Sequence, residues 1–197
     1  MEADWEIEVG GGAPVIEALW TGFVDLRAQP GRIVEISEVA KCAPLAELLL
    51  ALNGTVSGLW TAKCDLWEPD APVVAGETSL PDAELRCGAS GASHALACYV
   101  DLLPLNGRVF PLWTEAESFC RAWVDRLAEV SIPEARLDLV VRQAVAGTSE
   151  GFGVTAYFHA EAGSGAAAIS SLAAAFSAFA ASIPPLPAPA GAVSRIQ

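Results

Sequence analysis

The sequence predicts an α+β fold, built on a largely antiparallel five-stranded sheet with helices on one face. Three observations predict this class. Four short segments alternate apolar and polar residues, a fifth alternating segment follows a Gly-containing turn, and three segments carry apolar stripes at helical spacing. Alternation with period two is typical of a half-buried strand, whereas steps of three and four residues are typical of an amphipathic helix.

The four alternating segments share a pattern in which one aspartate stands among apolar residues. They are residues 23–26, 63–66, 99–102 and 136–139, and their aspartates lie 40, 36 and 37 residues apart. Intervals of this size indicate a repeated supersecondary unit. Chance is the alternative explanation, because strands draw on few residue types. The fifth strand is expected after residues 147–151, where Phe152, Val154 and Ala156 begin a new alternation.

The three predicted helices lie between and after these strands. Pro44 is suited to open the first one, Thr114 and Glu117 have the spacing of a capping box for the second, and Pro184 ends the third. The expected buried stripes are Leu45, Leu48, Leu49 and Leu52, then Phe119, Trp123, Leu127 and Val130, then Ile169, Leu172, Phe176 and Phe179.

The order of the predicted elements is strand, helix, strand, strand, helix, strand, strand, helix. Its first six members spell βαββαβ, the ferredoxin-like pattern, to which a C-terminal strand and helix are added. Residues 1–183 are expected to form one α+β domain, in which 68–92 is a loop-rich insertion or connector. Residues 184–197 are expected to be a Pro-rich tail.

Charge and cysteine content restrict the partners and the compartment. Twenty-four acidic residues against 11 basic ones give a net charge of -13, which disfavours binding to nucleic acid or to an anionic membrane. The charge-free Ala-rich segment at 165–183 has a one-sided stripe, unlike a membrane-spanning helix. Five cysteines without CxxC spacing, after an acidic N-terminus unlike a targeting signal, favour a cytoplasmic protein with reduced thiols.

No chemical motif in the sequence identifies a reaction. The two histidines, His94 and His159, have no metal-ligand spacing, so neither a metal nor another cofactor is expected. The Gly-Ser run at 88–93 leads into a predicted strand and lacks a P-loop lysine, so it is interpreted as a connector.

The alternation instead points to one polar face of the sheet as the candidate site. Aromatic and charged side chains are expected together there, either as a ligand cleft, as an interface, or as an ordinary solvated face with cross-strand ion pairs. The candidate residues are Lys63, Asp65, Trp67, Tyr99, Asp101, Asp138, Arg142, Tyr157, His159 and Glu161.

Three hypotheses for the function follow. The first is a noncatalytic interaction or assembly protein that uses its acidic surface and this face to bind itself, as a homo-oligomer, or a partner. The second is a small-molecule-binding protein or enzyme in which His159 acts as acid/base and Asp138, Tyr157 or Glu161 orients it. The third is an acidic inhibitor or immunity-type protein for a basic target.

Overall fold

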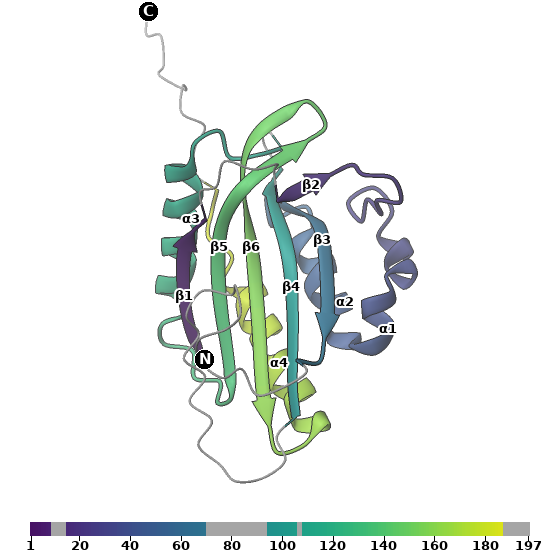
Figure 1. Cartoon of the computed structure of the whole chain (residues 1–197), viewed down its shortest axis with the longest axis vertical. Helices are drawn as coiled ribbons and strands as arrows, with labels where there is room; N and C mark the ends of the chain where they lie inside the picture. The colour runs from purple at the N-terminus through teal and green to yellow at the C-terminus, as the bar shows by residue number, and fades with distance from the viewer. Residues whose placement is uncertain (9–14, 70–93, 106–107, 187–197) are drawn as a thin grey trace, which may run out of the picture.

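The computed structural model describes residues 1–8, 15–69, 94–105 and 108–186 (Figure 1). Its strands are β1 (Glu2–Ile7), β2 (Ile16–Ala18), β3 (Leu59–Trp67), β4 (His94–Pro104), β5 (Ala135–Ala146) and β6 (Ser149–Ala162). Its helices are the 3-10 helix η1 (Pro30–Glu35), α1 (Ser37–Lys41), α2 (Ala43–Leu52), α3 (Trp113–Leu127) and α4 (Gly165–Ala181). Most of the predicted insertion at 68–92 and of the predicted tail at 184–197 lies outside the described residues.

The α+β class is confirmed, but the sheet is mixed. Within the described residues it has six strands in the order β1-β5-β6-β4-β3, with β2 also paired to β5. Strands β3 to β6 pair antiparallel, whereas β1 and β2 both run parallel to β5. The expectation of a largely antiparallel five-stranded sheet is therefore wrong, and the ferredoxin-like pattern is not confirmed. The prediction failed because the two N-terminal strands, β1 and β2, add parallel pairs with β5, whose residues are more than a hundred positions away in the chain.

Strand β1 was not predicted, although its sequence alternates. Ala3, Trp5 and Ile7 pack against the core cluster, while the residues between them are acidic. The register runs from Glu2 opposite Arg136 to Ile7 opposite Val141. At the outer edge of the sheet, the Asp4 side chain accepts a hydrogen bond of 2.8 Å from the Trp5 backbone amide. This contact shields an edge N–H group that could otherwise pair with another chain.

Only three of the four repeated segments are strands. Residues 63–66, 99–102 and 136–139 lie in β3, β4 and β5, but residues 23–26 lie in a turn region. Gly22 has a φ of 96°, and the Phe23 amide bonds back to the carbonyl of Trp20. The Asp25 carboxylate accepts from the Arg27 backbone amide and guanidinium instead of lining a strand. The prediction of a strand at 23–26 is therefore wrong.

Strand β3 changes sides partway along its length. A register shift between Thr61 and Cys64 marks a bulge, which reorients the side chains on either side of it. Trp60 consequently packs with Ala62 in a second apolar cluster, whereas Cys64 joins the main core. Thr61 bonds to Asn53 at the end of α2. Strict alternation along residues 60–66 predicts that Trp60, Ala62, Cys64 and Leu66 share one face, and this prediction is wrong because the bulge separates Trp60 and Ala62 from Cys64 and Leu66.

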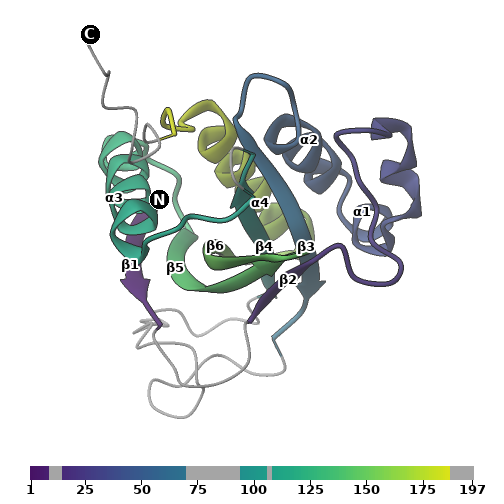
Figure 2. The same ribbon diagram turned by 90° about the horizontal axis from the view of Figure 1, so that it is seen from above.

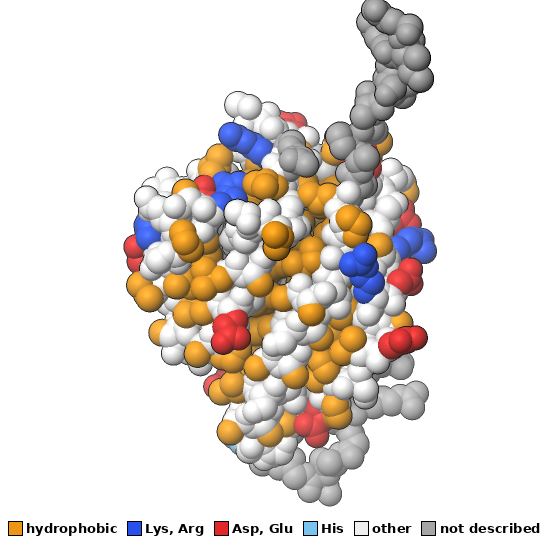
Figure 3. Space-filling model, turned by 180° about the vertical axis from the view of Figure 1, so that it is seen from behind, with side chains coloured by type: hydrophobic (Ala, Val, Ile, Leu, Met, Phe, Trp, Pro, Cys, Tyr) orange, Lys and Arg blue, Asp and Glu red, His pale blue; other side chains and the backbone are white. Residues whose placement is uncertain are grey.

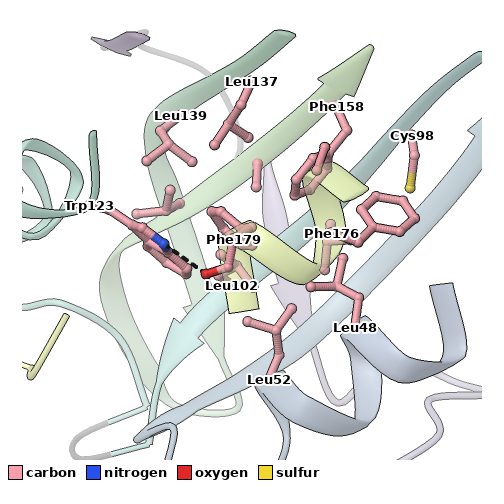
Figure 4. Close-up of a cluster of buried hydrophobic side chains, with 14 of the residues drawn as sticks. Leu48, Leu52, Cys98, Leu102, Trp123, Leu137, Leu139, Phe158, Phe176 and Phe179 are labelled. Atoms are coloured by element: carbon pink, nitrogen blue, oxygen red, sulfur yellow. Dashed lines mark hydrogen bonds between the residues drawn. The ribbon is translucent and has the colours of Figure 1, made fainter. Parts of the chain in front are cut away.

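Helices α2, α3 and α4 all lie on one side of the sheet (Figure 2). Their apolar stripes meet the inward residues of β4, β5 and β6 in one large cluster. At its centre the Trp123 and Phe179 rings stack 3.8 Å apart, and the indole N–H of Trp123 donates to the Phe179 carbonyl at 3.1 Å (Figure 4). Phe158 of β6 packs edge-on against Phe179, so the sheet and two helices share this contact.

Three details of the predicted helices differ from the structure. Val130, expected in the buried stripe of the second helix, lies beyond the end of α3 at Leu127 and is half-buried. Helix α3 begins at Trp113 after the N-cap residue Leu112, so Thr114 is already inside the helix and the predicted capping box is absent. Ile169 is 37% exposed and does not belong to the buried stripe of α4. A helix has room for only one buried face, and here Ala168, Leu172 and Ala175 occupy it.

The outer surface of the helical layer is largely apolar, with scattered charges (Figure 3). Small exposed residues of α4 contribute to it because that helix carries no charged side chain. None of the helices in the described part of the chain combines the length and the apolar character needed to cross a membrane.

A second, smaller apolar cluster lies on the opposite face of the sheet. Ile16 and Ala18 of β2 cover Leu103, Trp60 and Ala144 there. The cluster also includes Ala62, Val109 and Ala146, with Phe23 packed against it. This cluster confines the polar part of that face to the remaining length of the strands.

Gly153 of β6 is required by this second cluster. A Cβ atom at Gly153 would lie 2.9 Å from side-chain carbons of Ile16 and Leu103 and 3.0 Å from the backbone oxygen of Leu102. We expect Gly153→Ala to lower the free energy of unfolding by about 1–2 kcal/mol, because overpacking forces these neighbours apart. Urea denaturation measures the change. Gly163→Ala is the matched control, since a Cβ there meets nothing within 4 Å. Equal stability of the two variants would contradict the assignment.

Candidate functional site

The polar part of the sheet face that α2, α3 and α4 leave uncovered is the candidate site. We call it the outer polar face. The structure brings all the candidate residues predicted from the sequence to this face, in register across β3, β4, β5 and β6, and adds residues from β1. Its members are Glu2, Asp4, Glu6, Glu8, Lys63, Asp65, Trp67, Tyr99, Asp101, Arg136, Asp138, Arg142, Thr155, Tyr157, His159 and Glu161.

One row of side chains crosses five strands at the middle of this face. Asp4 lies opposite Asp138, which lies opposite Tyr157, then Tyr99 and finally Asp65. Such opposed side chains are close enough to interact directly. The row therefore places two phenol rings between carboxylates.

Three aromatic rings form a continuous ladder on the outer polar face. The ring centroids of Trp67 and Tyr99 lie 6.2 Å apart, and those of Tyr99 and Tyr157 lie 5.8 Å apart. Both pairs are tilted, a geometry within the favourable range for aromatic contacts. The three side chains are half-buried, so part of each ring remains open to solvent. We refer to Trp67, Tyr99 and Tyr157 as the aromatic ladder.

Asp101 is a buried carboxylate beside this ladder. Its side chain accepts a hydrogen bond of 2.7 Å from the Thr155 hydroxyl, and the residue is only 6% exposed. Burial raises the pKa of Asp101 to about 6, although the Thr155 hydrogen bond and the charges of Arg142 and Lys63 oppose the shift. These favourable contacts therefore offset only part of the cost of removing the charge from water.

Lys63 of β3 is exposed, and β3 pairs with β4, the strand that carries Tyr99 of the aromatic ladder. Hydrogen bonding to Tyr99, followed by the charges of Asp101 and Asp65, raises the pKa of Lys63. The bulge in β3 brings Lys63 to this face, because the register shift falls at residues 61–64. Lys63 therefore adds one positive charge to this part of the outer polar face.

Two arginines of β5 bind acidic residues on the same face. Arg136 contacts both carboxylate oxygens of Asp138, at 2.8 to 3.0 Å. Arg142 bonds Glu8 at 2.7 Å and donates to the Tyr157 hydroxyl at 2.6 Å. Both guanidinium groups are therefore engaged by side chains of the chain itself.

His159 lies next to Arg136 in the sheet register. Burial lowers the pKa of His159, although the charges of Glu161 and Asp138 oppose the shift. The imidazole is therefore biased towards its neutral form. Asp138, one of the three residues expected to orient this histidine beside Tyr157 and Glu161, forms an ion pair with Arg136.

Sequence reasoning missed the residues that β1 contributes. Glu2, Asp4, Glu6 and Glu8 alternate with inward residues along β1 and the residue after it, and each points a carboxylate to the outer polar face. Burial and repulsion from Asp138 raise the pKa of Glu6, a sign that acidic groups are crowded here. The alternation of acidic and apolar residues at positions 2–7 is the signal in the sequence that indicates this strand. Arg136 and Thr155 also face this side and were not predicted as site residues.

The four cysteines that the structure describes lie apart from this face and are poor nucleophiles. Burial raises the pKa of Cys64 and of Cys120 to about 12, and it also raises the pKa of Cys42 and of Cys98. Thiolates are therefore scarce at neutral pH. Cys87 and the Gly-Ser run at 88–93 lie outside the described residues. Among the residues that are described, no cluster of His, Cys, Asp or Glu side chains has the geometry to hold a metal ion.

Comparison with known proteins found no matching family model, no matching curated protein and no matching solved structure. The chemistry of the outer polar face is therefore the basis for assigning a function.

Proposed function

We propose that the chain is a noncatalytic interaction protein that binds a basic protein segment through its outer polar face. One observation carries the proposal. The outward side of β1 presents carboxylates at Glu2, Asp4, Glu6 and Glu8, and the aromatic ladder lies on the same face. Carboxylates attract and orient a cationic partner, and partly exposed aromatic rings supply apolar contact area.

The charge balance of the outer polar face favours a basic partner. Arg136 pairs with Asp138 and, at 3.9 Å, with Glu2, and Arg142 pairs with Glu8; the carboxylates of this face outnumber its cationic groups, so an acidic excess remains. That excess agrees with the net charge of -13 of the chain. Like charges repel across an interface, so a second copy of the chain is a poorer fit to this face than a basic partner. The acidic-inhibitor hypothesis is one form that such an interaction could take, because its target is also basic.

Binding has more support than acid/base catalysis at His159. A catalytic histidine needs a partner that fixes its tautomer and favours its protonated form during the reaction. Burial lowers the pKa of His159 more than the charges of Glu161 and Asp138 raise it, and Asp138 is bonded to Arg136. A small-molecule or enzymatic role around His159 stays as the alternative proposal.

The test measures binding of a short fluorescein-labelled peptide that alternates lysine and serine, using fluorescence anisotropy. A glutamine–serine peptide is the neutral probe. The variant Glu2→Gln/Asp4→Asn/Glu6→Gln removes three carboxylates from β1 while keeping hydrogen-bond acceptors. We expect it to weaken binding of the lysine peptide by about tenfold, because each removed charge takes away part of the electrostatic attraction.

The matched control removes the same number of charges from the helical side of the molecule. Glu47, Asp125 and Glu129 are exposed there, on α2 and in and just after α3. We expect Glu47→Gln/Asp125→Asn/Glu129→Gln to change affinity by no more than about twofold, since exposed charges away from the site are screened by salt. Equal losses in the two triple variants would mean that net charge alone attracts the peptide, and the proposed face would then be rejected.

A further inference from the structure

Three arginines of the described chain lie over an aromatic ring. The pairs, with the distance from the guanidinium carbon to the ring centroid, are Arg27 on Trp60 at 4.0 Å, Arg121 on Trp5 at 4.2 Å and Arg142 on Tyr157 at 5.3 Å. Each of these guanidinium groups also forms an ion pair with a carboxylate, at 2.7 or 2.8 Å. A guanidinium suits this arrangement because it is planar, so it stacks on a ring while its N–H groups donate to a carboxylate. A ring beside a carboxylate is therefore the environment in which this protein holds an arginine.

The end of the aromatic ladder at β3 has both of these parts. The rings of Trp67 and Tyr99 lie 6.2 Å apart with their planes tilted by 57°, and both side chains are half-buried. Asp65 lies directly opposite Tyr99 and two residues before Trp67, and its side chain is exposed. The Oδ1 atom of Asp65 accepts from the backbone amide of Leu66 at 2.8 Å, which fixes the carboxylate close to the strand. Within the described residues, no arginine lies over either of these two rings.

The other end of the ladder shows the same groups with an arginine in place. Arg142 lies over the Tyr157 ring, donates to the Tyr157 hydroxyl at 2.6 Å and donates to the Glu8 carboxylate at 2.7 Å. Tyr157 and Tyr99 are neighbouring rings of the ladder, with centroids 5.8 Å apart. One end of the ladder therefore demonstrates, within the chain itself, how a guanidinium is bound on this face.

We propose that Trp67, Tyr99 and Asp65 form a binding position for an arginine side chain of the basic partner. The guanidinium stacks on one of the two rings and donates to the Asp65 carboxylate. Arginine is preferred to lysine there, because an ammonium is a strongly hydrated point charge and has no plane with which to stack. This inference rests on the proposed function and names the side chain that the outer polar face recognises.

The first test compares two peptides of equal length and charge by fluorescence anisotropy. One alternates arginine and serine, and the other is the lysine–serine peptide. The ratio of their affinities cancels the contribution of net charge, including that of Lys63, which is exposed two residues before Asp65. We expect the arginine peptide to bind the native chain about fivefold more tightly. Equal affinities, or tighter binding of the lysine peptide, would overturn the proposal.

A double variant locates the preference for arginine. Trp67→Leu/Asp65→Asn removes the indole ring and the carboxylate charge, and we expect it to bring the ratio to about one. Trp113→Leu/Asp125→Asn makes the same two changes at exposed residues of α3 and is expected to keep the native ratio. Trp67→Phe keeps a ring and is expected to retain a higher ratio than the double variant. A native ratio in Trp67→Leu/Asp65→Asn would place the preference elsewhere on the molecule and remove the assignment.

A measurement on the native chain does not depend on how the double variant folds. NMR gives separate indole N–H signals for the tryptophans, and Trp67→Phe and Trp113→Phe assign two of them. Saturation with the arginine peptide is expected to shift the Trp67 signal more than saturation with the lysine peptide does, because a stacked guanidinium changes the surroundings of the ring. The Trp113 signal is expected to stay in place. A Trp67 signal that responds equally to the two peptides would contradict the proposal.

The two proposals fail in distinguishable ways. Glu2→Gln/Asp4→Asn/Glu6→Gln is expected to weaken binding of both peptides and to keep their ratio, because it leaves the aromatic ladder intact. If that variant weakens binding but the native chain shows no preference for arginine, the proposed function stands and the arginine position is wrong. If the native chain binds neither peptide at low salt, both proposals are wrong.

Discussion

Trp123→Ala is expected to lower the free energy of unfolding by about 3–5 kcal/mol, the usual range for removing a fully buried aromatic side chain. Trp123 is 0% exposed, stacks on Phe179 at 3.8 Å and meets Phe119 at 5.2 Å. The variant leaves a cavity between α3 and α4 and removes the indole donor from the Phe179 carbonyl. A loss of this size is a large fraction of the roughly 5–15 kcal/mol by which domains are stable.

Urea denaturation followed by circular dichroism measures this loss. Trp113→Ala is the control, because Trp113 begins the same helix but is 44% exposed. We expect that variant to lose less than about 1 kcal/mol. Trp123→Phe should fall between the two, since it keeps a ring and loses only the hydrogen bond and some volume. Similar losses for Trp123→Ala and Trp113→Ala would contradict the central place of this contact in the core.

Asp101→Asn is expected to stabilise the protein at pH 7.5 by about 1–3 kcal/mol and to leave its stability at pH 4 nearly unchanged. The pKa of Asp101 is raised from 3.8 to about 6 in the folded chain. The unfolded chain therefore releases this proton first as the pH rises, and native stability falls between about pH 4 and pH 6. Asparagine mimics the protonated carboxyl and still accepts from Thr155, so the variant lacks this decline.

The charged and polar neighbours of Asp101 set the size of the effect. Lys63 on β3 and Arg142 on β5 favour the ionised form, as does the hydroxyl of Thr155 on β6. Urea denaturation at several pH values, compared with Asp125→Asn on the exposed side of α3, isolates the contribution of Asp101. If Asp101→Asn were less stable than the native protein at pH 7.5, the stabilisation of the ionised carboxylate by these three neighbours would exceed the cost of burying its charge.

The elements that depend on local pattern were predictable. The stripe of Leu45, Leu48, Leu49 and Leu52 in α2 is buried as predicted, and so are Phe119 and Trp123 in α3. The alternation of β6 was also predictable, because a half-buried strand must place every second side chain against the core. The same alternation predicted the members of the candidate site, because it places Tyr99, Asp101, Tyr157 and His159 on the side of their strands that faces away from the core.

Features that depend on a distant partner were not predictable from local pattern. Because of the bulge in β3, Trp60 faces the second apolar cluster and not the main core. No residue type near the bulge indicates a register shift. Residues 23–26 resemble a strand, but Gly22 and the contact of Asp25 with Arg27 hold them in a turn. Burial of Asp101 likewise depends on neighbours from other strands, so its raised pKa had no local signal.

The sequence by itself determined the α+β class, the buried helical stripes and the polar sheet face, because each depends on the spacing of side chains along a few turns or one strand. The tertiary structure alone decided that β1 and β2 run parallel to β5, and so that Glu2, Asp4 and Glu6 join the outer polar face. Strand direction and register are set by long-range pairing, where the free energy of burial must exceed the entropy of closing a loop of more than a hundred residues. That balance is a property of the whole chain and of no single segment in it.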